Sequence, residues 1–177
     1  QACLRAIDAA WRHLVTDANV HPSRIIIFGR SIGSGPAVDL AHRKSVKPHP
    51  QKKLACDQCG RKPFSCRNHS PAHCGGVVLQ SPLSSGARAV FNKTVSIVGY
   101  PWDIFKNYTK VASIDRPVLI MHGVEDEVVP CQNGRDLHAL LKKPFAPFWI
   151  PNCGHNDMPE QESFDYVGKF LASLRSP

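Results

Sequence analysis

The stretch Gly29-Arg30-Ser31-Ile32-Gly33 constrains the fold of this chain more than any other feature of its sequence. It follows the apolar run Ile25-Ile26-Ile27-Phe28, which is typical of a strand buried on both faces in a parallel sheet. It precedes residues 37–40, which predict a helix. A Gly-x-Ser-x-Gly sequence between an apolar strand and a helix is the setting of a nucleophile elbow, in which the serine hydroxyl stands above the carboxyl end of the strand.

The elbow imposes conditions on its neighbours. The turn is tight, so the residues two before and two after Ser31 must lack bulk, and glycine at 29 and 33 meets that need. Ser31 is also close to the start of the predicted helix, where developing negative charge is favoured. The alternative is a Gly-Ser loop that matches the motif by chance, and the flanking strand and helix favour the nucleophile.

The rest of the chain predicts the fold class. Further apolar runs predict strands at residues 76–80, 117–123 and 145–150, and amphipathic patterns predict helices at residues 2–16, 137–141 and 164–174. Strands alternating with helices predict an α/β fold with a mainly parallel sheet and flanking helices. No apolar run approaches the length of about 18 residues that a transmembrane helix needs, so we expect none.

A nucleophilic serine requires a base, and the base requires an acid that orients it. In α/β-hydrolase folds these occur in the order serine, acid, histidine. His155 follows the last predicted strand and is the candidate base, its alternative being a solvated loop histidine. The acid should follow the strand at 117–123, where position alone does not separate Glu125, Asp126 and Glu127.

Two other features at these strands have ordinary interpretations. His122 precedes every acid that could follow its strand, so it fits the chain order of a base poorly. We interpret it as a histidine packed at the end of a strand. Asp103 and Asp115 precede that strand and are interpreted as surface charges.

Residues 43–74 form a basic insertion within a single domain that spans residues 1–177. The insertion holds eight Lys and Arg residues and one acid, and therefore carries +7 of the net charge of +8. Because the remainder is nearly neutral, the charge does not indicate a nucleic-acid partner, and we expect none. Connections in compact domains are short, so a loop of this length is an insertion with its own purpose or is disordered.

The insertion also contains potential zinc ligands, which are Cys56, Cys59, Cys66, His69, His73 and Cys74. Four soft ligands can fill a tetrahedral zinc site, but the gap between Cys59 and Cys66 is short and the set of four is ambiguous. A solvated basic loop and a gene-model error such as a translated intron remain as alternatives. The chain has seven cysteines, an odd number, and we favour a reducing compartment over a disulfide framework.

The stretches GRSIGSGPAVDLA, VVLQSPLSSGARAVF, RPVLIMHGVEDEVV and CGHND resemble the alpha/beta-hydrolase-domain-17 family of serine hydrolases. The likeness covers residues 2–42 and 75–174. It implies the alpha/beta-hydrolase fold and a Ser-Asp-His triad with Ser31 as nucleophile, Asp126 as acid and His155 as base. It also implies that the Ile32 amide is one of the two donors of the oxyanion hole, and that no cofactor is needed.

The resemblance further implies an activity and a setting. That family removes palmitate from cysteine thioesters of membrane-associated proteins, so we expect an S-acylated protein substrate. We expect a cytoplasmic location at the face of membranes, with peripheral membrane association of the full-length parent. The alternatives are a carboxylesterase or serine peptidase of the same fold, or a truncated, inactive hydrolase whose Cys/His insertion is a binding module.

Two departures from the family qualify these expectations. The amino-terminal strands of the fold and the cysteine-rich tail of the family are expected to be missing from this chain, together with the loop that supplies the second oxyanion amide. These residues alone are therefore expected to be a weak enzyme. The basic insertion is foreign to the family pattern. Residues 83–113 lie where such folds place a cap, and Phe91, Trp102, Phe105 and Tyr108 could line an acyl groove or belong to the core.

We expect deletion of residues 45–72 to leave the hydrolase fold and its active site intact. The segment contributes almost nothing apolar to a core and sits at a connection, where changes of length are tolerated. Equilibrium unfolding of the shortened protein is the measurement. Loss of the cooperative transition would mean that the segment is structural.

Overall fold

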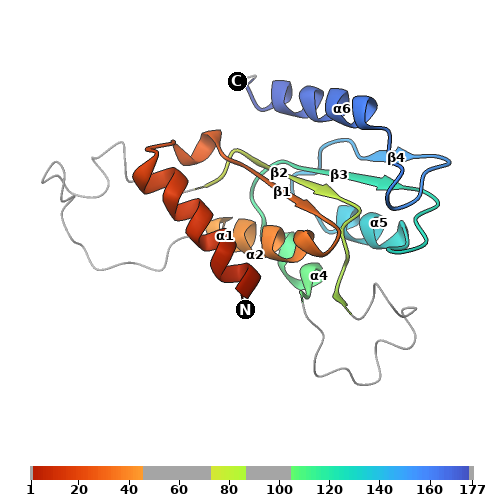
Figure 1. Cartoon of the computed structure of the whole chain (residues 1–177), viewed down its shortest axis with the longest axis horizontal. Helices are drawn as coiled ribbons and strands as arrows, with labels where there is room; N and C mark the ends of the chain where they lie inside the picture. The colour runs from red at the N-terminus through yellow and green to blue at the C-terminus, as the bar shows by residue number, and fades with distance from the viewer. Residues whose placement is uncertain (1, 46–72, 87–104, 176–177) are drawn as a thin grey trace, which may run out of the picture.

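The computed structural model describes residues 2–45, 73–86 and 105–175, which build a sheet with helices on both faces (Figure 1). The elements among these residues are α1 (Ala2–Arg12), a π-helical turn (His13–Asp17), a 3-10 turn (Pro22–Arg24), β1 (Ile26–Arg30), a 3-10 turn (Ser31–Gly33), α2 (Ser34–Ser45), β2 (Gly76–Gln80), α4 (Asn107–Lys110), a 3-10 turn (Val111–Ser113), β3 (Val118–Gly123), α5 (Gln132–Ala139), β4 (Phe148–Ile150) and α6 (Glu160–Ser173).

The four strands are parallel and lie in the order β1-β2-β3-β4, as the alternation of strands and helices predicted. All four carboxyl ends therefore lie at one edge of the sheet. The last strand is the shortest because Pro147, which has no amide to donate, precedes it. No helix among the described residues is both long and apolar enough to cross a membrane.

One face of the sheet packs against α1, α2 and α5. Ile27 of β1, Val77 of β2 and Val118 of β3 are neighbours in register and point into this core. Ala37, Val38 and Ala41 of α2 are fully buried there, and α1 adds Trp11 from the outer side of α2. Small residues on α2 allow the helix to approach the sheet closely, and this closeness sets the position of the turn that joins β1 to α2.

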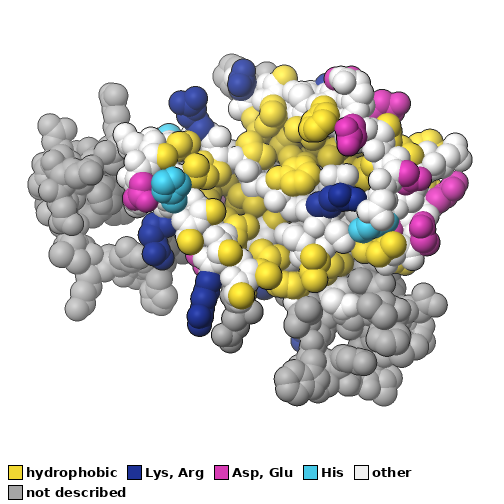
Figure 2. All heavy atoms as spheres, in the orientation of Figure 1, with side chains coloured by type: hydrophobic (Ala, Val, Ile, Leu, Met, Phe, Trp, Pro, Cys, Tyr) yellow, Lys and Arg dark blue, Asp and Glu magenta, His cyan; other side chains and the backbone are white. Residues whose placement is uncertain are grey.

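The opposite face is covered only in part. Phe28, Val78 and Leu119 form a row across β1, β2 and β3. The helix α6 packs on β3 and covers Leu119 and Val78, which are fully buried, whereas Phe28 is 54% exposed. Figure 2 shows hydrophobic side chains gathered on this face below α6. The expectation that the first strand is buried on both faces is therefore wrong for Phe28, because among the described residues no helix covers this face of β1.

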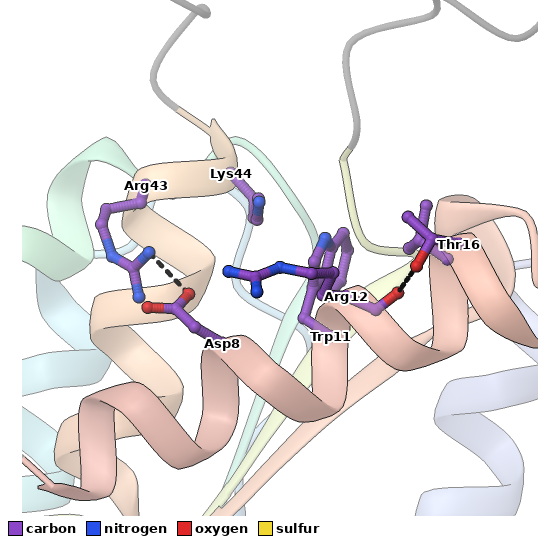
Figure 3. Close-up of a pocket in the computed structure, with 7 residues that line it drawn as sticks. Asp8, Trp11, Arg12, Thr16, Arg43 and Lys44 are labelled. Atoms are coloured by element: carbon purple, nitrogen blue, oxygen red, sulfur yellow. Dashed lines mark hydrogen bonds and ion pairs between the residues drawn. The ribbon is translucent and has the colours of Figure 1, made fainter.

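The contact between α1 and α2 changes the boundary of the basic insertion. The Arg43 guanidinium lies 2.8 Å from the Asp8 carboxylate, and the Lys44 ammonium lies 5.1 Å from the centre of the Trp11 ring. Figure 3 shows these side chains around the groove between the two helices. The start of the predicted insertion is thus part of the folded domain, since α2 continues to Ser45. A deletion that preserves α2 would begin at residue 46.

Several expectations for the insertion lie outside the described residues. These are the candidate zinc ligands Cys56, Cys59, Cys66 and His69. Within the described part of the chain, no group of three or more His, Cys, Asp or Glu residues could hold a metal ion. Cys74 is buried in the core that the sheet forms with α1, α2 and α5. Burial raises the pKa of its thiol to about 11, so this thiol behaves as a packed core group.

The expected cap, residues 83–113, is described only at its two ends, residues 83–86 and 105–113. Phe91 and Trp102 lie outside the described residues. Tyr108 packs against the core that the sheet forms with α1, α2 and α5. The Phe105 ring lies directly over Gly35 of α2, where an added Cβ atom would lie 2.2 Å from the ring. For Phe105 and Tyr108 the structure indicates packing against the domain.

Replacing Phe170 by alanine tests the packing of α6. This side chain is fully buried and lies 5.2 Å from the Phe145 ring, centre to centre. We expect the free energy of unfolding to fall by about 3–5 kcal/mol. Phe164→Ala on the same helix is the matched control, because Phe164 is 70% exposed, and it should change stability by less than about 0.5 kcal/mol. Equal effects in denaturant titrations would contradict this packing.

Candidate active site

The turn after β1 has the geometry of a nucleophile elbow. Ser31 adopts a left-handed backbone conformation with φ of 47° and is the first residue of the 3-10 turn that joins β1 to α2. Gly29 is required there, because a Cβ atom would lie 2.6 Å from the Cβ of Ala37 and 2.9 Å from the carbonyl oxygen of Gly33. The expectation that position 33 must also lack bulk is wrong for the described residues, which leave open space around Gly33.

The structure brings Ser31, His155 and Asp126 together in one line of hydrogen bonds. His155 Nε2 lies 3.0 Å from Ser31 Oγ, and His155 Nδ1 lies 2.7 Å from Asp126 Oδ2. The three residues follow β1, β4 and β3, respectively, and meet because the carboxyl ends of these strands share an edge. His155 and Asp126 are buried, so little water competes for these contacts.

Burial and contacts distinguish Asp126 from its acidic neighbours, which position in the sequence did not. Glu125 and Glu127 are exposed, whereas the Asp126 side chain is buried. Asp126 Oδ1 accepts hydrogen bonds from the amides of Val128 (3.0 Å) and Val129 (2.7 Å). Burial by itself raises the pKa of Asp126, but the Val129 amide and His155 outweigh it and hold the pKa below its ordinary value.

His122 is a neighbour of Asp126 that the sequence did not reveal as such. It is fully buried on β3, as the interpretation of a packed histidine predicts. Its Nε2 lies 2.8 Å from the carbonyl oxygen of Val129 and 3.2 Å from Asp126 Oδ2. Burial lowers the pKa of His122, which favours the neutral ring with the proton on Nε2. In the sequence, the only sign of this contact is the spacing of four residues between His122 and Asp126.

The loops that carry Asp126 and His155 are bound to each other through their backbones. The amide of Val124 donates to the carbonyl of Ile150, and the amide of Glu125 donates to the carbonyl of Cys153, both at 2.9 Å. Gly123 permits this approach, because a Cβ atom there would lie 2.3 Å from the Cys153 carbonyl oxygen. The short distance between Asp126 and His155 follows from this backbone pairing.

Ile32 follows the serine in the chain, and its backbone amide is the expected donor to a developing oxyanion. Ile32 lies in the 3-10 turn that opens α2, and the first amides of a helix lack acceptors within it. An amide at this position has no acceptor within the helix. The Ile32 side chain is 63% exposed and therefore does not pack into the core beneath this turn.

Substitution of Asp126 by asparagine should weaken the acid sensitivity of the fold. The pKa of Asp126 is lower in the folded protein than its ordinary value of 3.8, so the ionised carboxylate stabilises the folded state above that pH. This contribution is lost as the pH falls through the folded pKa. We therefore expect the parent to lose more stability than Asp126→Asn between about pH 5 and pH 2.

Denaturant titrations at several pH values provide the measurement. Glu125→Gln is the control, since it removes an exposed carboxylate from the same loop and should retain the parental dependence. An Asp126→Asn protein with the full parental loss of stability in acid would contradict the assigned hydrogen bonds.

Comparisons with known proteins show which sequences and folds this chain is similar to. No protein-family model matches the chain. It is 34% identical over 169 residues to alpha/beta hydrolase domain-containing protein 17B of Xenopus laevis and of Homo sapiens, which covers 96% of this chain and 46% of each relative. It is also 34% identical over 152 residues to protein 17C of Mus musculus, covering 86% of this chain and 38% of that relative. The chain thus spans less than half the length of the curated relatives it matches.

Solved structures with low sequence identity share the fold. A monoacylglycerol lipase from Paleococcus ferrophilus has a TM-score of 0.58 at 15% identity, over 97% of this chain and 74% of its own. An acetyl ester-xyloside bifunctional hydrolase from Caldicellulosiruptor lactoaceticus has a TM-score of 0.63 at 17% identity, over 97% and 64%. The chain therefore has the alpha/beta-hydrolase fold and resembles in sequence the alpha/beta-hydrolase-domain-17 proteins.

Proposed function

We propose that this chain carries the active site of a serine hydrolase that cleaves acyl thioesters or esters through an acyl-enzyme intermediate. The observation that carries the proposal is the unbroken line of contacts from Ser31 Oγ through the His155 ring to Asp126 Oδ2, at 3.0 and 2.7 Å. A serine on a strained turn, a histidine within reach of its hydroxyl and a buried carboxylate behind that histidine together form the constellation of nucleophilic acyl transfer.

In the first half of the reaction, Ser31 Oγ attacks the carbonyl carbon of the substrate. His155 Nε2 takes the hydroxyl proton as the new C–O bond forms, and Asp126 stabilises the imidazolium that results. The carbonyl oxygen becomes an oxyanion and accepts a hydrogen bond from the Ile32 amide. Collapse of the tetrahedral intermediate breaks the bond to the leaving thiol or alcohol, which receives the proton from His155.

In the second half, the acyl group leaves Ser31. Water attacks the acyl-enzyme carbonyl while His155 Nε2 takes a proton from it, and a second tetrahedral intermediate forms. Its collapse returns the proton to Ser31 Oγ and releases the carboxylic acid. This sequence of steps requires neither a metal ion nor an organic cofactor.

The proposed substrate is an S-palmitoylated protein, which the likeness to the alpha/beta-hydrolase-domain-17 family supports. Apolar side chains beside the site are compatible with an acyl chain. Ile32 follows the serine, Val124 and Val128 flank Asp126 along the chain, and all three are exposed. The proposal includes peripheral association of the whole protein with the cytoplasmic face of membranes, where such substrates occur.

We expect a fluorophosphonate probe to label the intact protein at Ser31. Ser31→Ala should abolish labelling, because the attacking oxygen is gone, and His155→Ala should reduce it nearly to nothing, because no base remains. Ser23→Ala, which removes an exposed hydroxyl from the 3-10 turn before β1, is the control and should label like the parent. Labelling is measured by gel fluorescence and by mass spectrometry of the modified peptide.

Turnover of palmitoyl thioesters and of peptide amides by the same protein separates the remaining alternatives. The proposed function requires thioester or ester hydrolysis that depends on Ser31. Faster cleavage of peptide amides would show a serine peptidase instead. Unchanged labelling of Ser31→Ala would show a different nucleophile, and no reaction of the intact parent with probe or substrate would show an inactive hydrolase.

A further inference from the structure

The histidine must cross most of the sheet to reach the serine. Ser31 follows β1 and His155 follows β4, and these two strands form opposite edges of the described sheet (Figure 1). With about 4.8 Å between neighbouring strands, β1 and β4 lie about 14 Å apart. The connection from β4 to α6, residues 151–159, is here called the histidine loop. It carries His155 across the ends of the strands between them.

The histidine loop is hydrogen-bonded on two sides. On the side of β4, the Cys153 carbonyl accepts from the Glu125 amide in the loop that carries Asp126. On the side of β1, the Arg30 side chain reaches the loop. Arg30 Nη2 donates to the backbone carbonyl of His155 at 3.2 Å and to Asn156 Oδ1 at 2.9 Å. Among the described residues, no other group donates to either acceptor.

The position of Arg30 in the sheet explains why its side chain meets this loop. Arg30 is the last residue of β1 and pairs in register with Gln80, which pairs with Met121. Met121 points into the core beneath α6, so the side chains of this row lie on the face from which the histidine loop enters α6. Gln80 Nε2 accordingly lies 3.4 Å from the sulfur of Met158 in the same loop.

We infer that Arg30 is a positioning residue that holds His155 in register with Ser31. The inference rests on the proposed hydrolase function. Arg30 precedes Ser31 directly, so one short piece of backbone fixes both the hydroxyl and the guanidinium that binds the histidine loop. The planar guanidinium can donate to two acceptors in a fixed geometry, and hydrogen bonds from a charged donor are stronger than those from a neutral one.

Loss of this contact should act on rate and not on substrate binding. Arg30→Gln should let the far side of the histidine loop move, and a displacement of about 1 Å in such a site costs up to about 100-fold in rate. We therefore expect Arg30→Gln to lower kcat and the rate constant of fluorophosphonate labelling by about 10- to 100-fold, with KM and the unfolding midpoint close to parental values.

Companion variants separate positioning from other roles. Arg30→Lys retains a charged donor on a shorter side chain without the planar fork of the guanidinium, and should restore part of the rate. Asn156→Ala leaves the His155 carbonyl in place and should cost less than Arg30→Gln, and combining the two should cost little more than Arg30→Gln alone. Arg24→Gln, which removes an exposed cation just before the other end of β1, is the control and should be neutral.

A readout independent of activity is the low-field proton resonance of His155 Nδ1–H bonded to Asp126, identified by its disappearance in His155→Ala. We expect Arg30→Gln to broaden or remove it. A parental resonance together with a parental labelling rate in Arg30→Gln would overturn the inference, as would a loss confined to KM, which would make Arg30 a substrate-binding residue. If Ser31→Ala labels like the parent, the proposed function fails, and the resonance alone still decides whether Arg30 positions His155.

Discussion

The arrangement of the site depends on the hydrogen bonds that the buried Asp126 carboxylate accepts. One of its oxygens accepts the amides of Val128 and Val129, and the other accepts from His155. Burying this carboxylate without hydrogen-bond partners would destabilise the folded protein by several kcal/mol. The loop that carries Asp126 therefore folds back on itself, and His155 approaches the carboxylate. Within a parallel sheet whose loops emerge at the same edge, satisfying this one charge brings His155 to Asp126.

The elements of the fold could be predicted from the sequence because their signals are local. Apolar runs predicted all four strands, the glycine at 29 fitted a close approach to α2, and the elbow motif located Ser31. The choice of Asp126 over Glu125 and Glu127 was different. It depends on which carboxylate turns inward, and only the resemblance selected one. In the structure that carboxylate is the buried one.

What the sequence did not reveal depends on contacts between distant segments. The bonds from Arg30 to the His155 carbonyl and Asn156 join residues more than 120 positions apart, and no periodicity encodes them. The exposure of Phe28 depends on which strand α6 covers. The basic insertion was bounded by composition, which could not show that Arg43 and Lys44 are held by side chains of α1.

The loop that carries Asp126 is joined through its backbone to the end of β4 and to the histidine loop, and this pairing separates two properties of the site: the side chains at its rim and the spacing of its loops. The bonds from Val124 to Ile150 and from Glu125 to Cys153 use only main-chain atoms. Side chains at positions 124 and 125 are exposed and can be exchanged without altering those bonds. Under the proposed function, the rim of the site can thus be diversified for new acyl groups while the main-chain bonds keep the spacing of the loops, which makes these positions a place to begin a library for altered selectivity.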